Sequence, residues 1–123
     1  MTFIKNTKKL ESFIGTNSIF KGDIETKGTL RIDGTVDGNI NADWVILGEK
    51  ASLNGNITAK GIIIGGNVVG NLTANENIEI KPKGKVHGEI STVKLIIAEG
   101  GLFDGRSIMG KEESKIVEFY AKG

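Results

Sequence analysis

The sequence contains no cysteine, one histidine and one proline among its 123 residues. Without cysteine the chain cannot form a disulfide framework or a thiolate metal site. It has no apolar run near the roughly 18 residues that a helix needs to span a bilayer, and its first residues lack the apolar stretch of a signal peptide. Its 16 basic and 15 acidic residues leave a net charge of +1, which gives no field that favours nucleic acid. We therefore expect a cytoplasmic protein.

Catalytic signatures are also missing from the sequence. It holds no Ser-His-Asp set, no HExxH, no nucleotide-binding phosphate loop and no calcium-binding nonapeptide. The one histidine, His87, shares a predicted outward row with charged and amide side chains, which favours a solvated surface position over a catalytic base. We expect no catalytic residue, cofactor, metal or nucleotide, and no enzymatic activity.

What the sequence does have is glycine, at 18 positions, and aliphatic residues that recur every 15 to 18 positions. Four such rows hold an aliphatic or phenylalanine side chain at 22 of 24 positions in six repeats. The rows are Phe20, Val36, Leu53, Val68, Val86 and Phe103; Ile24, Ile40, Ile57, Leu72, Ile90 and Ser107; Ile14, Ile32, Leu47, Ile64, Ile80 and Ile97; Ser12, Leu30, Val45, Ile62, Ile78 and Leu95. A fixed period of this kind predicts a solenoid, in which each coil stacks on the next.

Within a coil the pattern alternates as in strands, and spacings of 2, 4 and 5 do not follow a helical stripe. We predict an all-β fold, a parallel β-helix of about six coils over residues 12–109, about 29 Å tall at ~4.8 Å per stacked strand. A glycine row lies between the first two apolar rows: Gly22, Gly38, Gly55, Gly70, Gly88 and Gly105. We expect these glycines to face the interior or a corner, where a side chain would collide with the next coil.

The two ends of such a rod expose strand edges and a slice of apolar core. Monomeric solenoids usually close their ends with caps, whereas the flanks here are short. Phenylalanine enters the inward rows only in the first and last coils, at Phe20 and Phe103. We therefore predict end-to-end polymerisation, with like ends meeting or with head-to-tail stacking. The predicted polymerisation interface consists of Ile14, Phe20, Ile97, Leu102 and Phe103.

The flanks are assigned as residues 1–11 and 110–123. The first is interpreted either as a disordered start or as a short anchor on an anionic membrane surface, with apolar and basic contacts. The anchor would consist of Met1, Phe3, Ile4, Lys5, Lys8 and Lys9. In the second flank Ile116, Phe119 and Tyr120 have the i, i+3, i+4 spacing of a short helical turn or loose cap, and a flexible tail is the alternative.

Two outward rows stand out. Asn39, Asn56 and Asn71 fall in successive coils and could form an amide ladder with a structural role. An apolar row of Phe13, Ile46, Ile63 and Ile96 is interrupted by Arg31 and Glu79. That row could be covered by a tail, or could contact another filament or a membrane.

Two segments carry a family resemblance. The segments 30–40 (LRIDGTVDGNI) and 98–109 (AEGGLFDGRSIM) closely resemble the bactofilins, bacterial polymer-forming cytoskeletal proteins. The resemblance spans roughly residues 12–109 and implies a right-handed, three-sided β-helix. It also implies nucleotide-independent assembly into non-polar filaments, often membrane-attached through a short N-terminal segment, that organise cell shape and localise cell-wall enzymes. Phe103 would lie in the terminal-coil interface.

Two other functions are alternatives. A membrane-surface adaptor that binds as a small oligomer would use the same N-terminal segment. An acyltransferase on a hexapeptide β-helix would show a strict six-residue aliphatic period and usually a histidine base between subunits. The spacing of 15 to 18 residues and the single, outward His87 both speak against it. The filament-forming scaffold is the function that the sequence favours.

Overall fold

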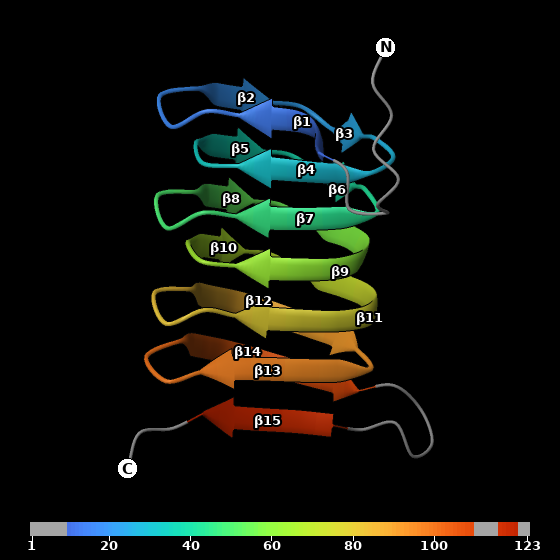
Figure 1. The fold of residues 1–123 in the computed structure, drawn as a ribbon, viewed down its shortest axis with the longest axis vertical. Coiled ribbons are helices and arrows are strands. Elements are labelled where there is room, and N and C mark those ends of the chain that lie inside the picture. The colour runs from blue at the N-terminus through green and yellow to red at the C-terminus, as the bar shows by residue number, and fades with distance from the viewer. Residues whose placement is uncertain (1–9, 110–115, 121–123) are drawn as a thin grey trace.

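The computed structural model describes the backbone of residues 10–109 and 116–120, and the side chains of residues 12–108. Every regular element in these ranges is a β-strand, and every strand pairing is parallel. In Figure 1 the front strands run to the left, the chain turns behind them and returns to the right, and each circuit lies below the last. This winding is right-handed. The prediction of a right-handed parallel β-solenoid of about six coils is confirmed.

The strands form three faces along the rod. We call face A the stack of β1 (Leu10–Ile14), β4 (Thr29–Ile32), β7 (Trp44–Leu47), the later parts of β9 (Ile57–Ile64) and β11 (Leu72–Ile80), β13 (Lys94–Ala98) and β15 (Ile116–Tyr120). Face B holds β2 (Ile19–Lys21), β5 (Thr35–Asp37), β8 (Ser52–Asn54), β10 (Asn67–Val69) and the first parts of β12 (Lys85–Thr92) and β14 (Leu102–Met109). Face C holds β3 (Ile24–Glu25), β6 (Ile40–Asn41), the first parts of β9 and β11, and the later parts of β12 and β14.

The residues of each predicted row lie directly above one another in successive coils of the structure. Each of the four apolar rows is a column of Cα partners, from Phe20↔Val36 to Val86↔Phe103 in the first row and equivalently in the others. In the four middle coils these side chains are at most 2% exposed. A further inward column of Ala42, Ala59 and Ala74 was missed, because small residues give a weak periodic signal. The core is therefore a continuous apolar column.

The glycine row occupies a corner between faces B and C. These glycines have φ values from +136° to +155°, a region that L-residues rarely adopt. A Cβ on Gly70 would overlap the carbonyl oxygen of Gly55 in the preceding coil. At each of the other row positions from Gly38 to Gly105, an added Cβ would likewise overlap the carbonyl oxygen of the row's glycine one coil earlier. The corner is close-packed backbone on backbone, as the sequence predicted.

Of the alternatives for the second flank, the helical turn at Ile116 is wrong. Ile116–Tyr120 forms β15, which pairs in parallel with β13, so that Lys94 is the Cα partner of Ile116 and Ala98 that of Tyr120. A single helical turn leaves most of its backbone groups without partners, whereas the edge of β13 offers a full ladder. The predicted membrane contacts Met1, Phe3, Ile4, Lys5, Lys8 and Lys9 lie outside the described residues, as do 110–115 and 121–123.

Candidate functional site: the two ends of the solenoid

The N-terminal end of the rod consists of β1, β2 and β3. The outer edges of all three strands pair with no other described strand. Phe20 is 39% exposed, although its stacking partner Val36 is fully buried. Ile14 and Ile24 are half-buried and pack against the core. Within the described part of the chain, this end therefore presents strand edges without a partner strand around an apolar centre, and such edges favour association with another chain.

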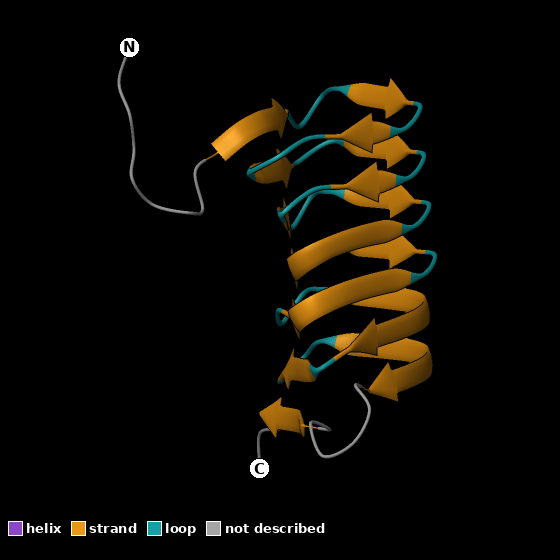
Figure 2. Cartoon of the chain, turned by 90° about the vertical axis from the view of Figure 1, so that its right-hand side faces the viewer, coloured by secondary structure: helices purple, strands orange, loops and turns teal. Residues whose placement is uncertain are grey.

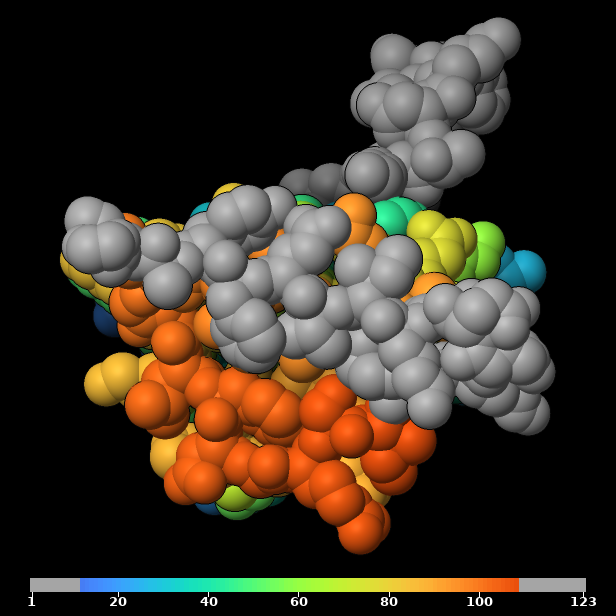
Figure 3. All heavy atoms as spheres, turned by 90° about the horizontal axis from the view of Figure 1, so that it is seen from below, coloured from blue at the N-terminus to red at the C-terminus, as the bar shows by residue number. Residues whose placement is uncertain are grey.

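The C-terminal end consists of β14 on faces B and C and of β15 on face A. Among the described strands, β14 pairs only with β12 and β15 only with β13. β14 carries Phe103, which packs against the core, and Leu102, which is 43% exposed. Viewed from this end in Figure 3, atoms of the last coil lie at the surface in orange. Face A differs, because β15 pairs along β13 and Ile97 is only 9% exposed.

The predicted interface residues thus divide into two sets. Ile14 and Phe20 lie in the first coil, and Leu102 and Phe103 lie in the last, five rungs further along the stack. Figure 2 shows these two coils at opposite ends of the rod. Ile97 belongs to a rung that β15 already covers with backbone pairing, so this part of the predicted surface is not an open edge.

Sequence reasoning missed two exposed apolar residues at the ends. The described large apolar side chains that are most exposed are Phe13, Ile19, Phe20, Val69, Leu102 and Ile108. All except Val69 lie in the first or last coil. Ile19 stands in an outward row whose middle members are Thr35, Ser52, Asn67 and Lys85, and Ile108 in a row that is otherwise polar. An apolar residue that ends a polar row was the signal that could have found them.

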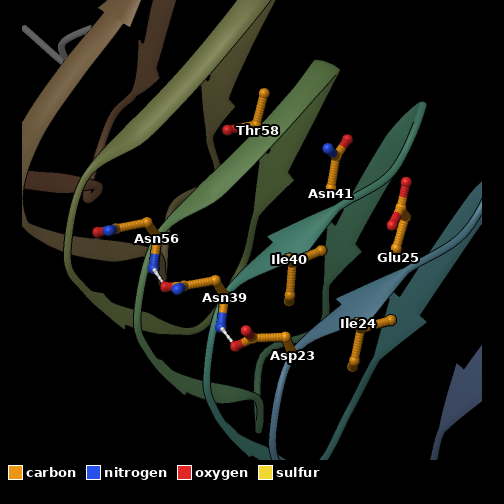
Figure 4. Close-up of a pocket in the computed structure, with 8 residues that line it drawn as sticks. All are labelled: Asp23, Ile24, Glu25, Asn39, Ile40, Asn41, Asn56 and Thr58. Carbon is orange, nitrogen blue, oxygen red and sulfur yellow. Dashed lines mark hydrogen bonds between the residues drawn. The ribbon is translucent and has the colours of Figure 1, made fainter.

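A polar ladder runs along the corner beside face C. The side-chain oxygens of Asp23, Asn39, Asn56 and Asn71 each accept a hydrogen bond from the backbone N–H one coil further on, at 3.0, 3.0, 2.9 and 3.2 Å. Figure 4 shows the first two of these bonds. The predicted stacking of Asn39, Asn56 and Asn71 in successive coils is confirmed, but their side-chain oxygens bond backbone N–H groups rather than other side-chain amides. The adjoining groove of about 500 Å³ includes Glu25 and Thr58 in its lining, but its ladder oxygens already have partners.

Asn56→Ala is expected to lower the free energy of unfolding by about 1 kcal/mol, because the N–H of Asn71 loses its acceptor. Asn54→Ala is the matched control, since Asn54 is an exposed amide in the same coil but on face B. Urea denaturation in a non-polymerising background measures both. Equal losses for the two variants would show that the ladder does not stabilise the stack.

Groups with catalytic potential are dispersed over the described surface. His87 is exposed, as predicted, and its Nδ1 lies 3.4 Å from Asp104 Oδ2 on the same outward row. No three His, Asp or Glu residues in the described part of the chain are arranged to hold a metal ion. Among the described residues there is also no helix that could cross a membrane.

Known proteins share this architecture. The family model described as "Bactofilin: Polymer-forming cytoskeletal" matches residues 12–108. Bactofilin BacP of Myxococcus xanthus (strain DK1622) is 30% identical over 101 residues, which cover 81% of this chain but only 42% of BacP. Bactofilin BacO of the same organism is 29% identical over 110 residues, covering 89% of this chain and 87% of BacO.

A solved structure agrees in fold. The cryo-EM reconstruction of Thermus thermophilus bactofilin double helical filaments superposes with a TM-score of 0.69 at 24% sequence identity, covering 81% of this chain and 100% of that one. A parallel β-solenoid with apolar, unpaired end coils is the framework of a structural, self-associating protein. The chain belongs to the bactofilin family, a polymer-forming cytoskeletal family.

Proposed function

We propose that this protein is a cytoskeletal scaffold whose subunits assemble end to end into nucleotide-independent, non-polar filaments. The observation that carries the proposal concerns residues 12–108, whose side chains the structure describes. Their exposed large apolar side chains lie, with one exception, in the first and last coils, at strand edges that pair with no other described strand. Joining two such ends pairs the backbone groups and removes apolar surface from water in the same step. The Thermus relative was reconstructed as double helical filaments, which supports both assembly and lateral pairing.

The two ends are proposed to join like to like. Such a contact is two-fold symmetric, so that a filament built from alternating contacts has no overall polarity. The N-terminal contact would use Ile14, Ile19 and Phe20, and the C-terminal contact Leu102, Phe103 and Ile108. On face A, β15 adds a strand beyond β13, and we propose that the C-terminal contact uses β14 on faces B and C.

Electron microscopy of the purified chain in nucleotide-free buffer tests the proposal. We expect filaments at micromolar concentration, whose amount is unchanged by added ATP or GTP. A monodisperse monomer at that concentration would contradict the proposed function.

A membrane-associated, cytoplasmic location is proposed for the filaments, with residues 1–9 as the contact and cell-shape or cell-wall machinery as the client. Three apolar and three basic side chains bind an anionic surface weakly, and a polymer multiplies that affinity. Co-sedimentation of the full chain and of a chain lacking residues 1–9 with anionic liposomes separates the possibilities. Equal pelleting with liposomes would remove the anchor, and an unpolymerised chain that still pellets would favour the small-oligomer adaptor.

A further inference from the structure

Face A carries an apolar row on its solvent side. The row consists of stacked partners on successive coils, Phe13, Arg31, Ile46, Ile63, Glu79 and Ile96. Phe13 is 59% exposed, and the three isoleucines are half-buried with one side toward solvent. A shallow groove of about 600 Å³ follows the row, with Ile46 and Ile63 in its lining. The polymer ends do not account for this surface, because it runs along the side of the rod.

Charged pairs flank the two central isoleucines. Arg31 Nη2 lies 3.1 Å from Asp33 Oδ1 on the second coil, and Lys81 Nζ lies 3.4 Å from Glu79 Oε2 on the fifth. The four side chains are between 19% and 49% exposed, so they remain accessible to a partner. The sum of their charges is zero, which does not favour an anionic lipid surface as the occupant.

The order of these residues is self-complementary. Along the rod the row is apolar, positive, apolar, apolar, negative, apolar. A second row lies two residues further along each strand of the four middle coils and stacks in the same way. It consists of Asp33, Gly48, Gly65 and Lys81, so it has a negative charge at one end, two glycines, and a positive charge at the other end. Reversing the direction of the rod exchanges every charge for its opposite and every apolar residue for an apolar residue.

We propose that face A is the lateral interface between two copies of this chain, which lie side by side with their rods antiparallel. The two-fold axis runs along the strand direction between the coils of Ile46 and Ile63. Arg31 then meets the partner's Glu79, and Asp33 meets the partner's Lys81. Ile46 meets the partner's Ile63 at the centre. Such a contact is isologous, because the same patch is used on both copies.

The parallel arrangement is the alternative pairing of the same two faces. It would bring Arg31 to the partner's Asp33 but would place Ile46 over the partner's Gly48. Apolar side chains would then meet glycine backbone, and less apolar surface would leave water. In the antiparallel arrangement, by contrast, every charged side chain meets one of opposite charge and the apolar side chains of the row meet one another.

The contact is small, which links it to the polymer. Six rungs at ~4.8 Å and four residues at ~3.3 Å bound an area of roughly 400 Å² per copy, about half of what a stable interface buries on each partner. Two single subunits should therefore pair weakly, whereas filaments sum the contact over many subunits. The inference thus rests on the proposed function for its strength.

Charge reversal in filaments tests the interface. Arg31→Glu or Glu79→Arg places like charges across the contact and is expected to lower the fraction of paired filaments at least about tenfold, while end-to-end assembly persists. The double variant R31E/E79R lets the reversed charges meet and is expected to restore pairing. Asp37→Lys, a charge reversal on face B of the same coil, is the control and should leave pairing unchanged. Filament width in negative-stain micrographs is the measurement, and circular dichroism confirms the fold.

The outcomes separate this inference from the proposed function. Wild-type filaments that are single, or pairs that survive Arg31→Glu, would overturn the lateral interface while leaving end-to-end assembly intact. Loss of pairing that the double variant does not restore would overturn the antiparallel register.

Disulfide cross-linking tests the interface in unpolymerised protein as well. The chain has no cysteine of its own, so any disulfide that forms joins the introduced cysteines. Arg31→Cys protein mixed with Glu79→Cys protein should form the mixed disulfide on oxidation. Each variant alone should form none, since its own cysteines would lie three rungs, about 14 Å, apart across the pair. Disulfides within each variant alone, with no mixed product, would contradict the proposal.

Discussion

Replacing Phe103 with arginine is expected to abolish long filaments and to leave the solenoid folded. Phe103 packs against the core on the free edge of β14, at the centre of the proposed C-terminal contact. In a joined end the guanidinium would be enclosed without a counter-charge, which costs about 3 kcal/mol or more and raises the critical concentration at least about a hundredfold. In a free end the same group reaches water while its stem covers the core, so the fold tolerates it.

The size of the remaining species reports the polarity of assembly. If like ends meet, Phe103→Arg leaves the first-coil contact intact and the protein stops at a dimer, as does Phe20→Arg through the other end. Head-to-tail stacking would give a monomer for either variant. Analytical ultracentrifugation distinguishes the two.

Val69→Arg is the control for these substitutions. Val69 is 52% exposed on face B in a middle coil, so the variant adds the same charge away from both ends. We expect it to polymerise normally. A Phe103→Arg protein that also polymerises like the parent would place the interface elsewhere.

Gly70→Ala is expected to destabilise the fold by more than about 3 kcal/mol. Its φ of +148° is unfavourable for alanine, and the added Cβ would overlap the carbonyl oxygen of Gly55. The backbone cannot move away cheaply, because the N–H of Gly70 bonds His87 O at 2.9 Å and the N–H of Gly55 bonds Val69 O at 2.9 Å.

Gly22→Ala separates strain from collision. Gly22 has a similar φ of +136°, but it begins the row, and the nearest atom to an added Cβ is 3.6 Å away on Phe20. We expect this variant to lose only the conformational term, about 1–2 kcal/mol. Urea denaturation followed by fluorescence of the single tryptophan, in a non-polymerising background, measures both. Equal losses would show that backbone strain alone accounts for the glycine row.

Much of the fold was predictable, because in a solenoid the residues that are in contact between coils recur at a regular spacing in the sequence. Val36 contacts Leu53 in space since both occupy the same position in successive coils. The aliphatic rows therefore gave the register, and Phe20 and Phe103 gave the two ends. Ile116–Tyr120 was not predictable from its own pattern. Its strand conformation depends on the free edge of β13, and a local helical spacing contains no information about that edge.

The amino-acid sequence by itself determined the coil period, the four inward rows, the glycine corner and the positions of Phe20 and Phe103 in the end coils. Each of these is a choice of side chain repeated at a fixed interval. Only the tertiary structure decided that β15 covers one face of the C-terminal end, that ladder asparagines bond backbone N–H groups, and that the charges of face A are accessible along one side of the rod. These features depend on which edges stay unpaired and which atoms approach one another once the coils have stacked.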